Sequence, residues 1–427
     1  MNTMDNCTSV VITGAGCLLP GCDSPAELWQ RALEQRCATV PYADDMVRSE
    51  LITRFGHINT QQSAAALDAV PFKLRRYATA ASQWGIKATK DALVSANLEL
   101  ASVDAERVGV FTAQADYCYP AVQSFMTGIR QQYEQGELDI PGLTHEFLNA
   151  RGMDSFLSIK GLSNNMLAIA SLAFGSRGDC GAYVQNASAT LAALRSAMIS
   201  LKRGDSDVAL VIFTGSYNEA LTLAELFQAQ QLTSAGASNE FRPFDQARDG
   251  GIAGEGAIAF VLETAARARA RSAPVLATID GISNTTRFER DPSAYRRCTD
   301  RLLQSIGLDL DSVDAIVARG LGSKDDDEQE IQQLEHLLVD GQAIPVTCAS
   351  PITGLVPACP VDLLLALQML QHQQIPAIAN LTRPASTRVP WVYRQPHTKA
   401  IARVLSLGRC YSGFHSAVSL SLPSFIG

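Results

Sequence analysis

The stretch FRPFDQARDGGIAGEGAIAFVLE, residues 241–263, is the most distinctive part of this sequence. Its first half places positive and negative side chains close together, namely Arg242, Asp245, Arg248 and Asp249. Several glycines follow, and glycine permits φ > 0 turns and a close approach between backbone segments. The pattern predicts a buried, salt-bridged corner that holds a loop at the border of an active-site-like cavity.

The composition of the whole chain excludes several classes of protein. A length of 427 residues is sufficient for a large core in one large domain or two fused domains. Hydrophobic residues make up 47% and charged residues 18%, which is typical of a well-packed globular protein and not of a disordered one. The formal net charge of −8 argues against a nucleic-acid partner, because such a protein needs a basic face.

Targeting and metal-binding signals are missing from the sequence. The N-terminal residues have neither a basic segment nor a long apolar core, and no apolar run approaches the roughly 20 residues of a membrane span. The ten cysteines are scattered, without CxxC pairs and without histidines at metal-ligand spacing. We therefore expect a reduced, cytoplasmic protein with no membrane span, no metal and no cofactor.

Short apolar strands alternate with helical patterns along the chain, which is typical of an α/β fold with mixed or parallel sheets. We expect strands at 9–16, 107–114, 181–186, 207–215, 275–282, 313–320, 344–350, 402–408 and 416–422. We expect helices at 24–35, 74–96, 188–204, 330–340 and 361–374.

Two features recur in the two halves of the chain. The strands at 107–114 and 313–320 both end in a turn of small residues, and a buried helix follows a loop at 188 and again at 361. A basic, alanine-rich segment, ETAARARARSAP, lies between the halves at 263–274. The sequence therefore predicts a pseudo-duplicated fold with an N-terminal half, 1–265, and a C-terminal half, 266–427.

Three short motifs have simple structural interpretations. GAGCLLPG (14–21) has Leu19 in place of the third glycine of a dinucleotide-binding loop, so it indicates a tight strand-to-helix turn. KDDDE (324–328) could suggest a cation site, but acidic side chains before a helix favour its dipole, so we expect a solvated cluster. FKLRRY (72–77) is a basic cluster that forms a solvated helix face or steers an acidic partner.

Several stretches together resemble the β-ketoacyl-acyl-carrier-protein synthases of the thiolase fold over nearly the whole chain. The first three resemble the family's first strand and helix, its second helical block and the segment before its nucleophile strand: VVITGAGCLLPGCDSPAELWQRALEQR (10–36), LRRYATAASQWGIKATKDAL (74–93) and GLSNNMLAIASLAFGSRG (161–178). Two more match the family in order and spacing, LKRGDSDVALV (201–211) and RPFDQARDGGIAGEGAIAFVLE (242–263). The resemblance implies a thiolase-like α/β fold, in which two pseudo-duplicated halves form a five-layered α-β-α-β-α architecture.

The same resemblance shows which catalytic groups of the family are missing. Family enzymes carry a nucleophilic cysteine at a strand-to-helix elbow, and the matching position in GAYVQNASATLAAL (181–194) is Ala187. Their first histidine, in Asn-Ala-His-Gly-Thr, is replaced by Arg319 in Val-Ala-Arg-Gly-Leu. Their second histidine follows the motif Lys-Ser-x-x-Gly. The matching segment here is Ser-Pro-Ile-Thr-Gly-Leu, with Ser350 in place of the lysine and Leu355 in place of the histidine.

The family reaction needs each of these groups. A thiolate at a helix N-terminus accepts the acyl chain, and two histidines assist decarboxylation and stabilise the developing anions, each contribution being on the order of 3–4 kcal/mol. Ala187 has no lone pair, Leu355 offers no hydrogen bond, and Arg319 is not an ordinary base at neutral pH. We therefore expect that this subunit cannot perform the ketosynthase reaction by the family route.

Chain-length factors share this pattern, since they are ketosynthase-like subunits without the reactive cysteine that pair with an active ketosynthase. The resemblance implies a heterodimer whose interface includes the strand at 181–186, with Tyr183 and Gln185 as candidate interface residues. In such pairs the silent subunit closes a tunnel for the growing chain. The candidates for lining that tunnel, each of which could equally be an ordinary packing residue, are Tyr119, Gln123, Phe125 and Met126.

The resemblance also implies an acyl carrier protein as a partner, and Lys73, Arg75 and Arg76 are the candidates for docking it. The nearest subtype is the partner subunit of a bacterial aryl-polyene ketosynthase, within fatty-acid- or polyketide-type biosynthesis.

Three alternatives stay open at this point. Ser188 and His415 could form the dyad of an acyl hydrolase or transferase, although serine is common as a helix N-cap and no carboxylate is placed to orient His415. A decarboxylase that supplies primers normally has glutamine at the cysteine position and keeps both histidines, which Arg319 and Leu355 contradict. A homodimeric structural or binding protein is the third alternative.

Overall fold

The computed structural model describes residues 8–42, 52–115, 129, 132–134, 137–148, 154–185, 187–233, 240–286, 291–338, 342–410 and 413–423. Its main element is a ten-stranded mixed sheet with the order β12-β11-β15-β16-β10-β1-β9-β8-β4-β7. These strands are β1 (Val10–Leu18), β4 (Val108–Gln114), β7 (Cys180–Val184), β8 (Val208–Ser216), β9 (Glu255–Thr264), β10 (Ala277–Thr286), β11 (Ala315–Ala318), β12 (Val346–Cys348), β15 (Arg403–Arg409) and β16 (Phe414–Ser421).

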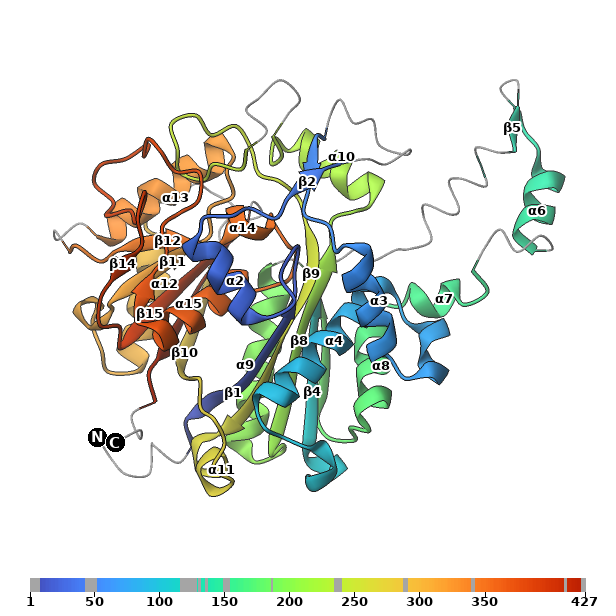
Figure 1. Ribbon diagram of the computed structural model, residues 1–427, viewed down its shortest axis with the longest axis horizontal. Helices are drawn as coiled ribbons and strands as arrows, with labels where there is room; N and C mark the ends of the chain where they lie inside the picture. Colours follow the sequence, from blue (N-terminus) through green and yellow to red (C-terminus); the bar gives the residue numbers. More distant parts are fainter. Residues whose placement is uncertain are drawn as a thin grey trace.

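The α-helices alternate with these strands along the chain (Figure 1). They are α2 (Pro25–Leu33), α3 (Thr60–Ala69), α4 (Ala80–Ser95), α6 (Ile140–Leu148), α7 (Leu157–Lys160), α8 (Asn165–Phe174), α9 (Ala187–Arg203), α10 (Ala220–Gln228), α11 (Ala265–Ala270), α12 (Ala294–Ser305), α13 (Lys324–Leu337), α14 (Ser350–Thr353) and α15 (Val361–His372). Short pairs of strands lie outside the main sheet, namely β2 (Val40–Pro41) with β3 (Arg54–Phe55), β5 (Tyr133–Glu134) with β6 (Glu137–Leu138), and β13 (Gln374–Ile375) with β14 (His397–Thr398).

The sheet confirms the predicted duplication. In the first half, β1 pairs antiparallel with β9, β9 antiparallel with β8, β8 parallel with β4, and β4 parallel with β7. The second half repeats this order of directions through β10, β16, β15, β11 and β12. A short antiparallel contact between β1 and β10 joins the halves. The boundary at 265/266, which falls at the start of α11, stays a prediction.

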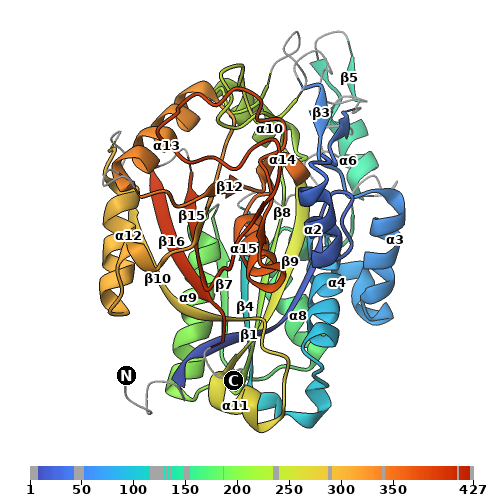
Figure 2. The same ribbon diagram turned by 60° about the vertical axis from the view of Figure 1, so that its left-hand side comes forward.

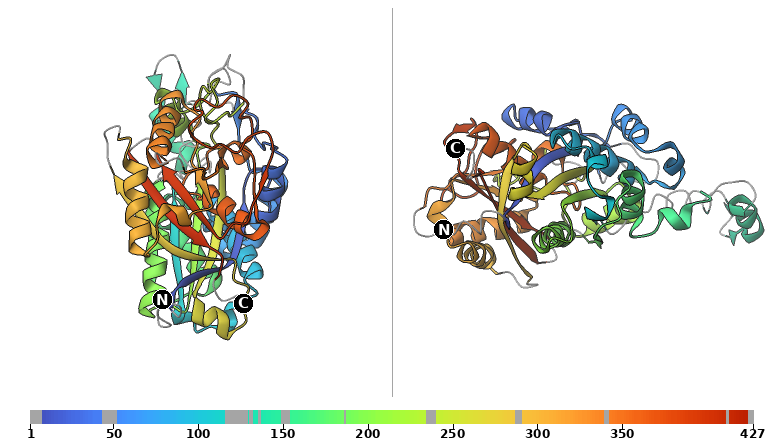
Figure 3. Two further views of the ribbon diagram at one scale, coloured as in Figure 1. Left: turned by 90° about the vertical axis from the view of Figure 1, so that its left-hand side faces the viewer. Right: turned by 90° about the horizontal axis from the view of Figure 1, so that it is seen from below.

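Helices form three layers around these two half-sheets, as the five-layered architecture requires. Side chains of α9 and α15 share one buried cluster with both half-sheets, so these two helices form the central layer. Helices α3, α4 and α8 cover the outer face of the first half, and α12 and α13 cover that of the second (Figures 2 and 3). This is the thiolase-like fold that the sequence predicted.

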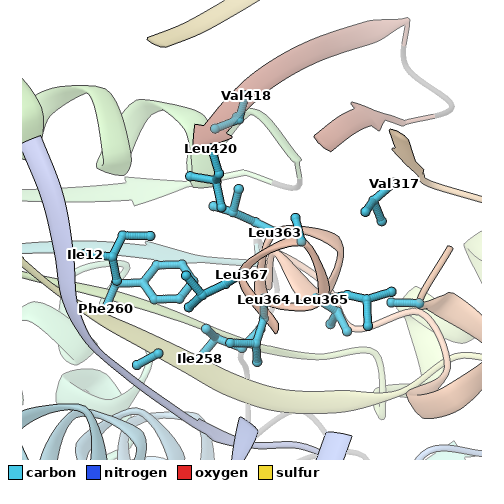
Figure 4. Packing of buried hydrophobic residues seen from close by; sticks show 14 of the residues in the cluster. Ile12, Ile258, Phe260, Val317, Leu363, Leu364, Leu365, Leu367, Val418 and Leu420 are labelled. Carbon is cyan, nitrogen blue, oxygen red and sulfur yellow. The ribbon is translucent and has the colours of Figure 1, made fainter. Parts of the chain in front are cut away.

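The central layer is dominated by the apolar run of α15. Leu363, Leu364, Leu365 and Leu367 are buried and point outward around the helix toward both half-sheets (Figure 4). A helix that is apolar on every side must be enclosed on every side, since apolar burial contributes about 25 cal/mol per Å². The composition of α15 thus places it at the centre of the protein.

The predicted helix at 74–96 is wrong in its first turn. Residues 72–77 form a separate 3₁₀ helix, and α4 begins only at Ala80, because the Thr79 side chain accepts a hydrogen bond from the backbone N–H of Ser82 and caps the helix there. The GAGCLLPG motif forms the expected tight turn only in its second half, where the backbones of Leu19 and Cys22 exchange hydrogen bonds before α2. Its Gly14 and Gly16 lie inside β1, where an added Cβ would meet carbonyl oxygens of α4 at 2.0 and 2.2 Å.

The strand β9 is missing from the predicted elements, although it lies in the stretch that opened the sequence analysis. Its sequence, EGAIAFVLET, contains glycine and alanine, which have a low preference for strands. It forms because β1 and β8 pair with its two edges, while α4 and α9 cover its two faces. The glycine-rich segment before it makes the turn into this central position.

Gly250 in that segment provides a stability prediction. Its φ is +142°, and an added Cβ would lie 2.3 Å from the backbone of Leu232 and Thr233. We expect Gly250→Ala to lower the free energy of unfolding by about 2 kcal/mol more than Gly307→Ala does. Gly307 also has a positive φ, of +69°, but nothing lies within 4 Å of its added Cβ. Urea unfolding of both variants measures the difference, and equal losses would contradict the close approach.

No helix in the described ranges is long and apolar enough to cross a membrane.

Candidate functional site

A cavity of about 100 Å³ lies beside the central layer, between α9, α15 and the ends of β11 and β15. Its lining includes apolar side chains of α9 and α15, such as Leu194 and Leu363, and the strand residue Val418; Figure 4 shows Leu363 and Val418 on facing elements. Two of the four substituted positions, Arg319 and Leu355, also line it. The structure therefore brings the replaced histidine positions together near the start of α9, where Ala187 is the first residue.

Arg319 follows β11, and both its backbone and its side chain donate hydrogen bonds to carboxylates. Its backbone N–H donates to Glu330 Oε1 at 2.9 Å, and its Nη1 donates to Asp362 Oδ2 at 3.0 Å. Burial opposes the charge, yet Asp362 holds the pKa of Arg319 above its ordinary value, so the guanidinium stays protonated. A general base is therefore absent at this position.

Asp362, the partner of Arg319, was missed in the sequence analysis. Burial raises its pKa to about 6, although the charge of Arg319 lowers it. The signal was present, because Asp362 is the only carboxylate in the apolar run VDLLLALQML (361–370). A buried carboxylate needs a cationic or hydrogen-bonding partner, so this residue could have been paired with the unusual arginine.

Leu355 and Ser350 occupy structural roles. Leu355 is buried with Phe241, Ile252 and Leu321, and it offers no polar group to the cavity. The Ser350 hydroxyl is buried and donates to the carbonyl oxygen of Gly320 at 2.7 Å. Both residues therefore support the loops that carry them and have no free group for acid–base chemistry.

Two thiols line the cavity, and the sequence analysis did not single them out. Cys359 is buried, and its Sγ donates to the carbonyl oxygen of Gly256 at 3.5 Å. Cys410 is half-buried and lies in the turn between β15 and β16. Neither thiol replaces the elbow cysteine, which in the family resemblance belongs to the start of α9.

The buried corner predicted for residues 241–263 is present, but its hydrogen bonds differ in detail from simple ion pairs. Asp245 is fully buried and accepts from the backbone N–H groups of Thr382 and Arg383 at 2.8 and 2.7 Å. Burial acts to raise its pKa, but these N–H donors hold the pKa of Asp245 below its ordinary value. Arg248 pairs with Glu328 at 3.0 Å.

The solvated interpretation of the acidic cluster at 324–328 is wrong for two of its residues. Helix α13 begins at Lys324, six residues earlier than expected, so the cluster forms its first turn. Asp326 is buried and pairs with Arg409 at 3.1 Å, and Asp327 accepts from two backbone N–H groups. Within the described ranges, no group of three or more His, Cys, Asp or Glu side chains could hold a metal ion.

The alternative dyad of Ser188 and His415 is not assembled. The Ser188 hydroxyl donates to Gln185 Oε1 at 2.6 Å. His415 Nδ1 lies 3.1 Å from the carbonyl oxygen of Gly413, which can only accept, and its Nε2 lies 3.0 Å from Gln333 Nε2. Both ring nitrogens are thus occupied, and neither contacts Ser188.

His415 should make stability depend on pH. Burial, followed by the charge of Arg409, lowers the pKa of His415 to about 4. Because this folded pKa lies below the ordinary 6.5, stability present above pH 6.5 is lost as the pH falls to 4, by up to about 3 kcal/mol. His415→Gln should lack this loss when urea unfolding is measured across that pH range. Parallel curves for the two proteins would contradict the assignment.

The candidate interface residues lie on and just after β7. Tyr183 is half-buried, and its hydroxyl lies 2.5 Å from Ser196 Oγ on α9, so it packs within the subunit. Gln185 is exposed. The candidate tunnel residues Tyr119, Gln123, Phe125 and Met126 lie outside the described residues.

The three candidate docking cations differ in their surroundings. Lys73 is exposed, and Arg76 is exposed and stacks 4.7 Å from the ring of Tyr77. Arg75 is half-buried and donates to the carbonyl oxygen of Val70 at 3.1 Å. Lys73 and Arg76 are therefore the two that remain accessible to a partner.

Comparisons with known proteins agree with this geometry. The model of the β-ketoacyl synthase N-terminal domain matches residues 8–268, and that of the C-terminal domain matches residues 270–382. The tetracenomycin polyketide synthase ketoacyl synthase alpha subunit of Streptomyces glaucescens is 25% identical over 97% of this chain and 97% of its own.

Two solved structures illustrate the match in fold. The ishigamide ketosynthase/chain length factor has a TM-score of 0.80 at 18% identity and covers 97% of this chain and 98% of its own. A type II polyketide acyl-carrier protein in complex with its ketosynthase contains a chain with a TM-score of 0.79 at 19% identity, which covers 97% of this chain and 99% of its own.

Proposed function

We propose that this chain, which belongs to the β-ketoacyl synthase family, is a chain-length-factor-like subunit without ketosynthase activity of its own. In this proposal it pairs with an active β-ketoacyl synthase and shapes the cavity in which the partner's acyl chain grows. The observation that carries the proposal is the Arg319–Asp362 ion pair beside Leu355, in a cavity where the family's two histidines would act.

The ion pair supports the loss of activity independently of the missing cysteine. Guanidinium and carboxylate pair at 3.0 Å inside the protein, and the guanidinium keeps its proton, so Arg319 cannot act as the base that a histidine would provide here. Restoring a cysteine at position 187 alone would not restore these functions. The chain keeps the ketosynthase fold but lacks the cysteine and the two histidines of the reaction. This combination fits a subunit whose role is to shape the partner's cavity.

The outer edge of β7 supports the pairing. Strand β7 ends the sheet, and no segment in the described ranges pairs with that edge. The other end of the sheet is covered, because Val346 of β12 exchanges backbone hydrogen bonds with Pro390 and Val392. An uncovered strand edge is a ready site for pairing with another chain.

The finer parts of the proposal are the pathway and the tunnel. Relatives named for polyketide synthases support polyketide-type assembly, and the ishigamide structure is named for a ketosynthase paired with a chain length factor. We place an aryl-polyene product among the candidates and assign tunnel lining to residues 119–126. The acyl-carrier-protein complex among the similar structures supports a carrier protein as a second partner, with Lys73 and Arg76 as its exposed cations.

The test is reconstitution with an active ketosynthase subunit and a carrier protein. Co-expression should yield a 1:1 complex that condenses acyl units, whereas this chain alone should not. A homodimer that performs condensation or thioester hydrolysis by itself would refute the proposal.

A further inference from the structure

Within the described part of the chain, two nitrogens of the Arg319 guanidinium have no hydrogen-bond acceptor. Its Nη1 donates to Asp362, but no group in the described part of the chain accepts from Nε or Nη2. Neither nitrogen is among the fully enclosed atoms that lack a partner, and 15% of the side chain is exposed. Arg319 lines the cavity, so we take these two N–H groups to be within reach of a molecule bound there. Donors that reach a cavity are satisfied by water or by a ligand, so an acceptor carried by a ligand can replace the water here.

The residues that line the cavity determine which chemical groups the remainder of the ligand can carry. Beyond Arg319 they are largely apolar, since they include Leu191, Leu194, Leu321, Leu355, Leu363 and Val418. At about 100 Å³ the cavity is smaller than the ~150 Å³ that admits benzene in an engineered cavity. The occupant is therefore a short apolar molecule with an acceptor at one end.

The charges around the cavity decide between an anionic and a neutral acceptor. The second arginine, Arg409, donates from Nη1 and Nη2 to Asp326, and its buried Nε has no hydrogen-bond partner in the described part of the chain. Three carboxyl groups lie near two guanidinium groups here, namely Asp326, Glu330 and Asp362 against Arg319 and Arg409. An added carboxylate would meet the Asp362 carboxylate across the same guanidinium, which is unfavourable.

We propose that this cavity is a binding site for a small neutral carbonyl compound, a ketone or amide, whose oxygen accepts from Nε and Nη2 of Arg319 while its alkyl part packs against the leucines. The Nε–Nη2 edge of arginine presents two parallel N–H groups, and a single carbonyl oxygen has two lone pairs to accept them. This is the cavity on which the proposed function also rests, but binding of the carbonyl compound needs neither the partner subunit nor condensation, so a failure of either proposal can be told from a failure of the other.

The probe is 2-butanone labelled with ¹³C at the carbonyl, added to the full chain and followed by NMR. The carbonyl resonance should move downfield on binding, because the oxygen accepts hydrogen bonds. Each added CH₂, as in 2-pentanone, should tighten binding about fourfold until the cavity is full. Butanoate, which has the same length and a negative charge, should bind at least tenfold more weakly than 2-butanone.

The double variant Arg319→Gln/Asp362→Asn keeps a hydrogen-bonded pair without its charges, and it should weaken 2-butanone binding tenfold or more. If its thermal unfolding shows that it does not fold, Leu363→Phe fills the cavity instead and should abolish binding with the ion pair intact. Tighter binding of butanoate than of 2-butanone would identify an anion site and overturn the proposal. Unchanged binding in a folded variant, or the absence of a downfield shift with the native chain, would also overturn it.

Discussion

Condensation by the reconstituted heterodimer should fall by at least about 10³-fold when the reactive cysteine of the active partner is changed to alanine. The reason is that this chain cannot supply a substitute nucleophile. Its elbow position is Ala187, and the positions of the two histidines hold a salt-bridged arginine and a buried leucine. The measurement is the rate of product formation from acyl and malonyl carrier-protein substrates, with complex formation verified by size-exclusion chromatography.

Two variants of this chain test whether it is non-catalytic or whether another nucleophile has replaced the missing cysteine. Ser188→Ala and Cys410→Ser should each leave the turnover of the complex within about twofold of the native value. The Ser188 hydroxyl is hydrogen-bonded to Gln185, and Cys410 lies between β15 and β16 and not at the elbow position, which is Ala187. Loss of turnover in either variant, with the complex intact, would assign catalysis to this chain, as would an acyl group covalently attached to it.

The sequence predicted the architecture well, because the apolar pattern of most strands is set locally. The strands expected at 107–114 and 207–215 match β4 and β8 to within one residue. The strand at 255–264 was missed, because its alanines and glycine become a strand only when two neighbours pair with it. The order of the strands with a local apolar pattern was thus predictable. A strand that forms only because neighbouring strands pair with it was not.

The site was predicted in part for a similar reason. The resemblance located Arg319 and Leu355, and both line the cavity. The partner of the arginine, Asp362, lies 43 residues away, and spacing alone does not connect the two. Spacing also fails to connect Asp326 with its partner. Its sequence pattern predicts a solvated helix start, but Asp326 is buried and pairs with Arg409, which lies near the end of the chain. Buried ion pairs depend on tertiary contacts that a motif does not contain.

The unpaired edge of β7 is the place where a substitution should weaken heterodimer formation most. The carbonyl of Asp179 accepts from Val110, and the N–H of Gln185 donates to Gln114, so alternate residues of this strand bond inward to β4. Because the pattern alternates, Cys180, Ala182 and Val184 face the free edge, although the Cys180 N–H already donates to Asp179 Oδ1. Only these positions can pair with another chain by extending the sheet.

Ala182→Pro should raise the dissociation constant of the heterodimer by about 10³-fold. Proline removes the central outward N–H and leaves a partner carbonyl unpaired, and its ring holds the neighbouring strand away. The fold of this chain should survive, since proline is tolerated on the free side of an edge strand. Ala182→Ser, which keeps the N–H, is the matched control. Analytical ultracentrifugation measures both, and a proline variant that associates as tightly as the serine variant would place the interface elsewhere on the protein.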